Sequence, residues 1–138
     1  MLRLTENSLT PEIYRRVRAS VGMKEYDEND VKLALQGTLF SVVAWEEDTP
    51  VGIGRVIGDG RVAFFIKDVA VLPERQGQGI GQKIMGAMMA YIRRTGSENA
   101  YVGLMALKDK EGFYRKFGFH VRPHEKEGSG MTQYLDEV

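Results

Sequence analysis

At 138 residues the chain has the length of one domain, and its apolar fraction of 43% and charged fraction of 28% are ordinary for a globular protein. Its 19 basic and 19 acidic residues cancel, which argues against broad nucleic-acid binding because that requires a basic face. The absence of cysteine excludes disulfides, thiolate metal sites and a cysteine nucleophile.

Hydropathy gives no sign of a membrane segment. No apolar run approaches the ~20 residues that span a bilayer. The N-terminal sequence MLRLTENSLTPEIYRR lacks the apolar centre of a signal peptide. We therefore expect a cytoplasmic protein without membrane or nucleic-acid partners.

The N-terminal quarter predicts a strand followed by two helices. The tetrapeptide LRLT fits a first strand. Thr10 and Pro11 are typical of an N-cap and a first helical position, and the apolar residues that follow recur every four positions, which predicts a helix over 11–21. After a polar stretch, Asp30 is a candidate cap for a short helix through Leu35.

The middle of the chain predicts three strands and a long helix. Two β-rich runs flank the turn EEDTP and indicate a hairpin, and the nearly continuous apolar run that follows is typical of a central strand covered on both faces. These strands fall at 39–47, 50–59 and 62–72. The apolar residues from 79 to 94 then lie on one helical face, and two arginines followed by Gly96 mark the end of that helix.

The C-terminal part predicts a strand, a short helix and two terminal strands, at 100–107, 111–117, 119–123 and 131–135. Several antiparallel strands thus precede a strand–helix–strand crossover near the middle of the chain. This order of elements predicts a mixed α/β protein.

One stretch, DVAVLPERQGQGIGQKI, points to function. A strand here passes into a helix through a loop that contains Gly77, Gly79 and Gly81. The first turn of a helix has unpaired N–H groups and a partial positive charge, and glycine lets an anion approach them because no side chain blocks the way. Since Arg75 and Lys83 add positive charge at the rim, we expect this loop to bind a diphosphate.

Two common phosphate-binding loops do not fit this sequence. A Walker loop needs Lys and then Ser or Thr after its last glycine, whereas Gly81 is followed by Gln82 and Lys83. A dinucleotide loop needs the pattern G-x-G-x-x-G, whose third glycine would fall at Gln82 or Ile84. Neither a Walker protein nor a dinucleotide-binding protein is therefore expected.

The pattern that remains is Gln76, two residues, Gly79, one residue and Gly81, which resembles the acetyl-CoA loop of the GNAT superfamily of N-acetyltransferases. A second segment, GFYRKFGF at 112–119, resembles the short helix near the family's C-terminus, where an aromatic-Tyr pair precedes Gly-Phe. It begins 31 residues after Gly81, separated by one helix and one strand, as in the family. The resemblance covers roughly residues 40 to 120.

The resemblance implies a fold and a cofactor. The fold would be a single GNAT-like domain over residues 1–138, with a mostly antiparallel, partly splayed sheet of six to seven strands flanked by about four helices. The cofactor would be acetyl-CoA. The splayed strand, which offers backbone groups to the pantetheine arm, would contain Val69, Ala70 and Val71. The residues around the pyrophosphate would be Gln76, Gly77, Gln78, Gly79, Ile80, Gly81 and Gln82.

Three more residues take roles from the same resemblance. Tyr114 would be the general acid beside the departing CoA sulfur, and Lys110 and Phe113 would flank the cofactor. The implied reaction is direct attack of an amine on the thioester in a ternary complex. A tyrosine, with a pKa of ~10, would give its proton to a thiol whose pKa is ~8.5. The alternative for Tyr114 is a buried residue that only packs the last helix.

The amine presents a second proton problem. An alkyl ammonium with a pKa near ~10.4 must lose its proton, which costs about 4.6 kcal/mol at pH 7. A base, or a water chain leading to one, is therefore expected. Asp68 is the first candidate, because desolvation in an apolar run tends to raise the pKa of a carboxyl; the alternative is a satisfied polar residue that faces a loop. Glu25 and Tyr26, in the polar segment that often lines the acceptor pocket in this family, are candidates for contact with substrate.

Three functions remain open on sequence grounds. We favour acetyl transfer to a small-molecule amine, because the chain carries no extension for recognising a protein. An acyl-CoA sensor without turnover and a protein-lysine acetyltransferase are the alternatives. A homodimer is a further expectation, since family members commonly pair. We expect no metal site, because His120 and His124 are too few and too sparse.

Overall fold

The computed structural model describes residues 1–137. The chain divides into two units, Met1–Leu104 and Met105–Val138. The first unit is built on a five-stranded sheet whose strands follow their order in the chain. The strands are β1 (Leu2–Glu6), β2 (Phe40–Glu46), β3 (Thr49–Gly58), β4 (Ala63–Val71) and β5 (Tyr101–Leu104). The neighbours from β1 to β4 pair antiparallel, and β4 pairs parallel with β5. A parallel pair needs a crossover, which α3 (Ile80–Thr95) provides.

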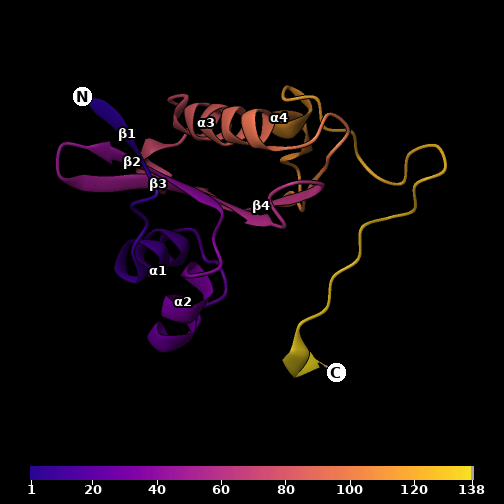
Figure 1. Cartoon of the computed structure of the whole chain (residues 1–138). Coiled ribbons are helices and arrows are strands. Elements are labelled where there is room, and N and C mark those ends of the chain that lie inside the picture. The colour runs from indigo at the N-terminus through magenta and orange to yellow at the C-terminus, as the bar shows by residue number, and fades with distance from the viewer. Residues whose placement is uncertain (138) are drawn as a thin grey trace. The chain divides into compact units, whose positions relative to one another are not determined.

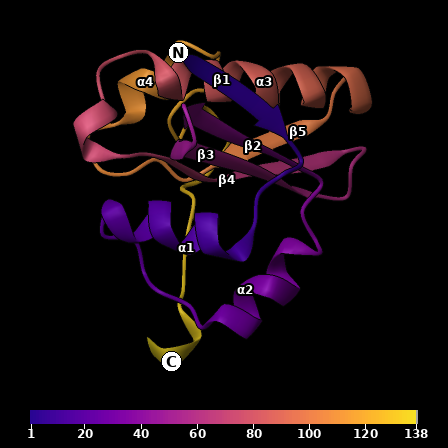
Figure 2. The same ribbon diagram turned by 90° about the vertical axis from the view of Figure 1, so that its left-hand side faces the viewer.

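Helices cover both faces of this sheet. Both views place α3 on one face and α1 (Pro11–Ser20) with α2 (Glu28–Leu35) on the other (Figures 1 and 2). Gly54 of β3 lets α3 approach closely, because a Cβ there would lie 2.6 Å from Cγ2 of Ile84. The opposite face buries an apolar cluster formed by Ile13, Tyr14, Val17, Val31, Val43, Ile53 and Ala70. Among the described residues, no helix is long and apolar enough to cross a membrane.

Capping residues explain where the first two helices begin. Thr10 caps α1 as predicted, and its Oγ1 accepts a hydrogen bond of 3.2 Å from the N–H of Ile13. The predicted cap of α2 was wrong. Asp27, not Asp30, precedes the helix and accepts from the N–H groups of Asn29 and Asp30, because an N-cap must stand outside the first turn it serves.

A bulge in β4 changes which face its side chains reach. Ile53 and Arg55, two apart on β3, pair with Ala70 and Lys67, which are three apart on β4. Asp68 and Val69 therefore lie opposite Gly54 alone, and Asp68 has a φ of 60°. One inserted residue moves every following side chain to the other face. This shift places Asp68 and Ala70 on the face that α1 covers.

The second unit contains the fourth helix, α4 (Glu111–Arg115), and a 3₁₀ turn at Leu135–Glu137. The predicted strands at 119–123 and 131–135 were wrong: the described part of this unit holds only an isolated bridge between His124 and Glu127. The sheet therefore has five strands instead of six to seven. Short β-rich segments bounded by proline or glycine do not repay their ordering cost without a neighbouring strand and a buried face.

Candidate active site

The glycine loop lies between β4 and α3, as the sequence predicted. After a 3₁₀ turn at Pro73–Arg75, Gly77 has a φ of 82° and Gly79 a φ of 81°. These are left-handed conformations that side chains other than glycine rarely adopt. A Cβ added at either position would meet nothing within 4 Å. The two glycines therefore set the path of the backbone and also leave open space beside it.

The first turn of α3 fits an anionic guest. Gly79 is its N-cap, without a side-chain hydrogen bond to the helix, and the first turn contains no acidic residue. The first intrahelical bond runs from the N–H of Lys83 to the Gly79 carbonyl, so the N–H groups before Lys83 in this turn have no partner within the helix. Unblocked N–H groups, the helix dipole and the charge of Lys83 together suit a diphosphate.

The edge of β4 next to the loop is free of β5. β5 pairs with β4 only from Ala63 to Ile66, so the part of β4 that contains Val69, Ala70 and Val71 continues past it. Within the described residues of the first unit, no strand pairs with this edge. The side-chain amide of Gln76 donates a hydrogen bond of 3.0 Å to the Val71 carbonyl and so ties the loop to this strand.

Asp68 does not lie in the apolar surroundings that the sequence suggested. It is buried between two arginines: Arg55 Nε donates a hydrogen bond of 3.0 Å to its Oδ2, and Arg18 Nε lies 3.0 Å from its Oδ1. Both guanidinium groups also lie over the ring of Tyr14; that of Arg18 is 5.0 Å from the ring centroid and that of Arg55 is 5.6 Å from it. Burial, and then the negative charge of Asp68, raise the pKa of Tyr14 above its usual value.

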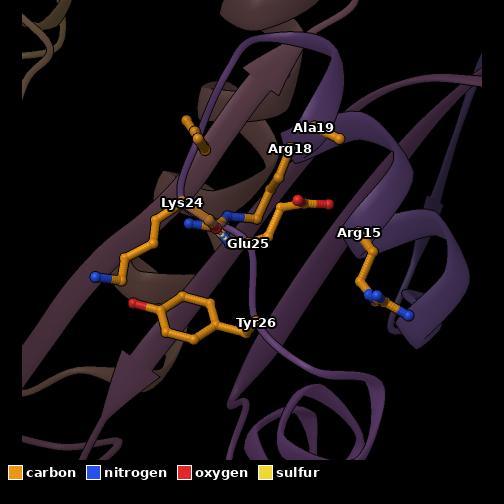
Figure 3. A pocket seen from close by; sticks show the side chains of 7 residues that line it. Arg15, Arg18, Ala19, Lys24, Glu25 and Tyr26 are labelled. Atoms are coloured by element: carbon orange, nitrogen blue, oxygen red, sulfur yellow. Dashed lines mark hydrogen bonds between the residues drawn. The ribbon is translucent and has the colours of Figure 1, made fainter. Parts of the chain in front are cut away.

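Arg18 connects this buried cluster with a surface pocket. The pocket is lined by Arg15, Arg18, Ala19, Met23, Lys24, Glu25 and Tyr26. Figure 3 shows the side chains of Lys24, Glu25 and Tyr26 around the guanidinium of Arg18. Arg18 Nη1 donates a hydrogen bond of 2.8 Å to the Lys24 carbonyl, and its guanidinium lies 5.4 Å from the Tyr26 ring centroid. Arg18 thus joins Asp68 to Tyr26, and Glu25 lines the same pocket.

The sequence analysis missed Arg18 and Arg55. Arg18 stands in a polar position of the helical pattern, next to the apolar Val17, and looks like a solvent-facing residue. Arg55 interrupts the apolar run of β3 as Asp68 interrupts that of β4. Two opposite charges in the interiors of adjacent buried strands are the signal that could have paired them, because buried charges need partners.

The remaining predicted site residues lie in the second unit. Tyr114 and Phe113 of α4 contact each other edge to face, with ring centroids 5.0 Å apart, and Tyr114 also meets Phe119 at 6.4 Å. Burial raises the pKa of Tyr114 above its usual value. This tyrosine therefore keeps its proton throughout the neutral range. Lys110 is the exposed residue that precedes the helix.

Fold and loop together define an α/β protein with a glycine loop between a central strand and a long helix. A family model described as an acetyltransferase (GNAT) domain matches residues 37–121. The chain belongs to this family.

The relatives agree with this assignment. The chain is 32% identical to a protein of Oryza sativa subsp. japonica named serotonin N-acetyltransferase 2, chloroplastic; the match covers 99% of this chain and 70% of that relative. A Staphylococcus aureus structure described as a probable acetyltransferase of unknown function has 37% identity and a TM-score of 0.89, covering 98% of this chain and all of the other. A predicted acetyltransferase with acetyl-CoA from Clostridium acetobutylicum shares the fold, with 17% identity, a TM-score of 0.70, and coverage of 100% of this chain and 99% of the other.

Proposed function

We propose that the chain is an N-acetyltransferase that moves the acetyl group of acetyl-CoA to a primary amine of a small molecule. The observation that carries this proposal is the loop in which Gly77 and Gly79, both at positive φ, lead into the uncapped first turn of α3. Two names support it: the structural neighbour described with acetyl-CoA, and the rice relative named for serotonin, which is itself a small primary amine.

The chain offers two backbone surfaces for the cofactor. The N–H groups from Gly77 to Gln82 would hold the pyrophosphate, and Lys83 would add positive charge beside it. Gln76 would flank the pyrophosphate without donating its N–H, which already bonds to the Pro73 carbonyl at 3.3 Å. The edge of β4 at Val69, Ala70 and Val71 would receive the amide groups of the pantetheine arm, because this edge lies beyond the end of β5. Lys110 and Phe113 would flank the cofactor. Bound acetyl-CoA would supply the activated acetyl group as a thioester.

Tyr114 would protonate the departing sulfur. Its raised pKa keeps the phenol protonated at neutral pH, which is the form that a general acid needs. A thiolate is a good leaving group, since a thiol has a pKa of ~8.5. The proton from Tyr114 would therefore assist a step that is already favourable, and its contribution to the rate would be moderate.

The pocket around Arg18 would receive the amine. Glu25 is the one carboxylate among its lining residues and would have to hold the ammonium group against the positive charges of Arg15, Arg18 and Lys24. Tyr26 offers an aromatic face. Asp68 was expected to take the amine's proton. Its contacts favour a positioning role instead, because both of its oxygens face guanidinium groups. The proton would then leave through Glu25 or through water in the open pocket.

A cofactor-binding assay with two matched variants tests the cradle. Gly79→Asp places a carboxylate beside the diphosphate, and aspartate tolerates a left-handed φ better than most residues, so the fold should survive. Repulsion of a few kcal/mol at a protein surface should weaken acetyl-CoA binding by roughly a hundredfold or more. Gly86→Asp adds the same charge in the middle of α3, where an added Cβ meets nothing within 4 Å, and serves as the control. Equal affinities for the two variants, measured by calorimetry, would refute the cradle.

Turnover separates the enzyme from a sensor. Incubation with acetyl-CoA and a panel of primary amines should release free thiol, with acetylated amine detected by mass spectrometry. If acetyl-CoA binds but no thiol is released in the presence of any amine or lysine peptide, the chain would be an acyl-CoA sensor. Thiol release with lysine peptides alone would instead favour a protein-lysine acetyltransferase.

A further inference from the structure

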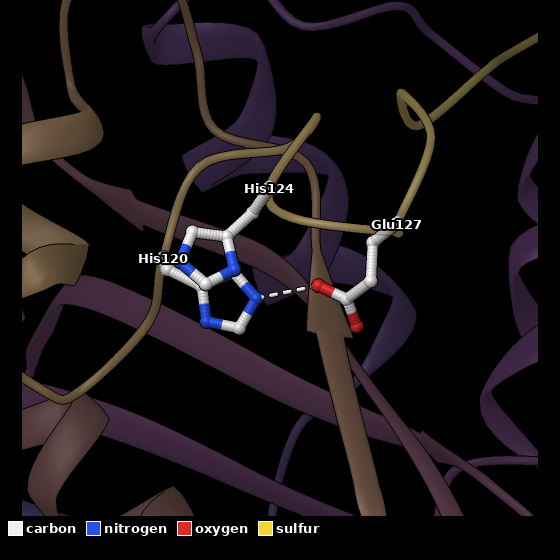
Figure 4. Close-up of side chains that lie close together, drawn as sticks. All are labelled: His120, His124 and Glu127. Atoms are coloured by element: carbon white, nitrogen blue, oxygen red, sulfur yellow. Dashed lines mark hydrogen bonds and ion pairs between the residues drawn. The ribbon is translucent and has the colours of Figure 1, made fainter.

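Residues 120–127 gather both histidines of the chain beside a carboxylate (Figure 4). His120 Nε2 lies 2.6 Å from Glu127 Oε1, and the rings of His120 and His124 have centroids 4.0 Å apart. One ligating atom from each of the three side chains lies within 4.8 Å of the others. All three residues belong to one short segment of the second unit, so only the local backbone is needed to bring them together.

A tight turn fixes two of these residues opposite each other. The N–H of His124 donates to the Glu127 carbonyl at 3.0 Å, and the N–H of Glu127 donates to the His124 carbonyl at 2.8 Å. Directly opposed residues of this kind have Cβ atoms roughly 5 Å apart. Outside this bridge, Arg122 Nε donates to the Gly128 carbonyl at 2.6 Å and closes the turn a second time.

We propose that His120, His124 and Glu127 bind a Zn²⁺ ion. Two imidazole nitrogens and one carboxylate oxygen form a ligand set that zinc accepts, and the chain has no cysteine to compete for the metal. Around a tetrahedral zinc ion, with bonds of ~2.0–2.2 Å, ligand atoms lie about 3.4 Å apart. The three side chains are exposed, so rotations about their side-chain bonds can widen the 2.6 Å between His120 and Glu127 and bring His124 to the same spacing, and water completes the coordination.

The charges of this segment do not oppose a divalent cation. Arg122 and Lys126 are balanced by Glu125 and Glu127, so the turn has no net charge.

The sequence argued against a metal site from the number of histidines. A zinc site can consist of three protein ligands with water as the fourth, and Glu127 supplies the third ligand that a count of histidines leaves out. The His120–Glu127 ion pair by itself would contribute little at an exposed position and would leave His124 without a function. A shared ion accounts for all three residues.

Zinc titration of the tag-free full chain tests the proposal. Calorimetry should detect one Zn²⁺ per chain, and Mg²⁺ should give no response, because it prefers oxygen ligands. His124→Ala and Glu127→Gln should each weaken binding by at least about tenfold, since even the loss of an outer-shell partner costs roughly 10- to 100-fold. Glu125→Gln, in the same turn, should bind as the wild type does.

A second readout does not depend on heat. Lys126 is an exposed trypsin site between His124 and Glu127. An ion that joins these two residues should slow cleavage after Lys126 in the wild type and in Glu125→Gln, but not in His124→Ala. The proposal is overturned if the wild type binds no zinc at 100 µM free ion, a generous limit of about −5.5 kcal/mol in binding free energy. It is equally overturned if His124→Ala and Glu127→Gln bind as the wild type does.

Discussion

Asp68 in the first unit and Glu127 in the second both pair with basic side chains, but in opposite surroundings. The side chain of Asp68 is 2% exposed and faces two arginines, whereas that of Glu127 is 45% exposed and faces a histidine. Water can replace the partner of Glu127 at little cost, but it cannot reach Asp68. The buried carboxylate is therefore committed to holding the structure together, and the exposed one remains free to exchange its partner for a ligand.

Removal of the buried carboxylate of Asp68 should lower the free energy of unfolding more than any other substitution considered. Asp68→Ala leaves two guanidinium groups without their counter-charge, and breaking a buried pair in this way costs about 3–5 kcal/mol. The free energy of unfolding, measured by urea denaturation of the full chain, should fall by that amount. Glu127→Gln is the matched control and should leave the urea midpoint unchanged in the absence of zinc. Similar losses from both variants would remove the distinction between the two carboxylates.

Tyr114→Phe tests whether the half-buried phenol of Tyr114, in the second unit, contributes to catalysis and not to stability. We expect kcat to fall roughly a hundredfold, the low end of what a general acid contributes, because a thiolate leaves readily. Affinity for acetyl-CoA and the urea midpoint should change little, since the described residues give the phenol no hydrogen-bond partner to lose. Initial rates of thiol release give kcat, and calorimetry gives the affinity. Wild-type turnover in the variant would remove the acid role.

Two glycines, Gly54 in the first unit and Gly112 in the second, allow the same comparison of a buried and an exposed position without a change of charge. A Cβ at Gly54 in β3 would lie 2.6 Å from Ile84 Cγ2 and 2.8 Å from Met88 Cε, whereas a Cβ at Gly112 in α4 would meet nothing within 4 Å. Gly54→Ala should therefore lower the free energy of unfolding by about 1–3 kcal/mol through overpacking. Gly112→Ala should not lower it, because alanine favours helix. Thermal or urea denaturation of both variants measures the difference.

Local sequence patterns predicted most of the first unit. The cap at Thr10, the β2–β3 hairpin, the long central strand and α3 all follow from periodicity, turn residues and glycines that act over a few positions. The cap of α2 failed because Asp27 and Asp30 are chemically identical candidates three residues apart, and only the backbone shows which of them stands outside the helix.

Contacts between distant residues were harder to predict. The partners of Asp68 are 50 and 13 positions away, and its face of the sheet depends on a one-residue bulge that no local pattern in β4 announces. The position of the glycine loop between a strand and a helix could be predicted because glycine acts on the backbone itself. The terminal strands failed for the opposite reason, since their β-rich letters need a partner strand that the described part of the second unit does not contain.

Asp59 is an exposed carboxylate in the first unit, so its substitution tests whether burial or the unit decides how much a carboxylate stabilises the protein. We expect this substitution to change the stability least. Asp59 is fully exposed, and its Oδ1 accepts from the N–H groups of Arg61, Val62 and Ala63 at 2.7, 2.9 and 3.1 Å. These bonds, that of Arg61 first, lower its pKa below the usual value. Because the pKa is lower in the folded state, the stabilisation is complete above the unfolded-state pKa of about 3.9 and is lost as the pH falls through the folded-state value.

The urea midpoints of the wild type and Asp59→Asn should therefore differ slightly at pH 6 and converge as the pH falls below the unfolded-state pKa of about 3.9 and on through the lower folded-state value. If burial and not the unit decides how strongly a carboxylate stabilises the protein, Asp59→Asn should resemble Glu127→Gln much more than Asp68→Ala. A loss as large as that of Asp68→Ala, or a difference that grows on acidification, would show that membership of the first unit matters more than burial.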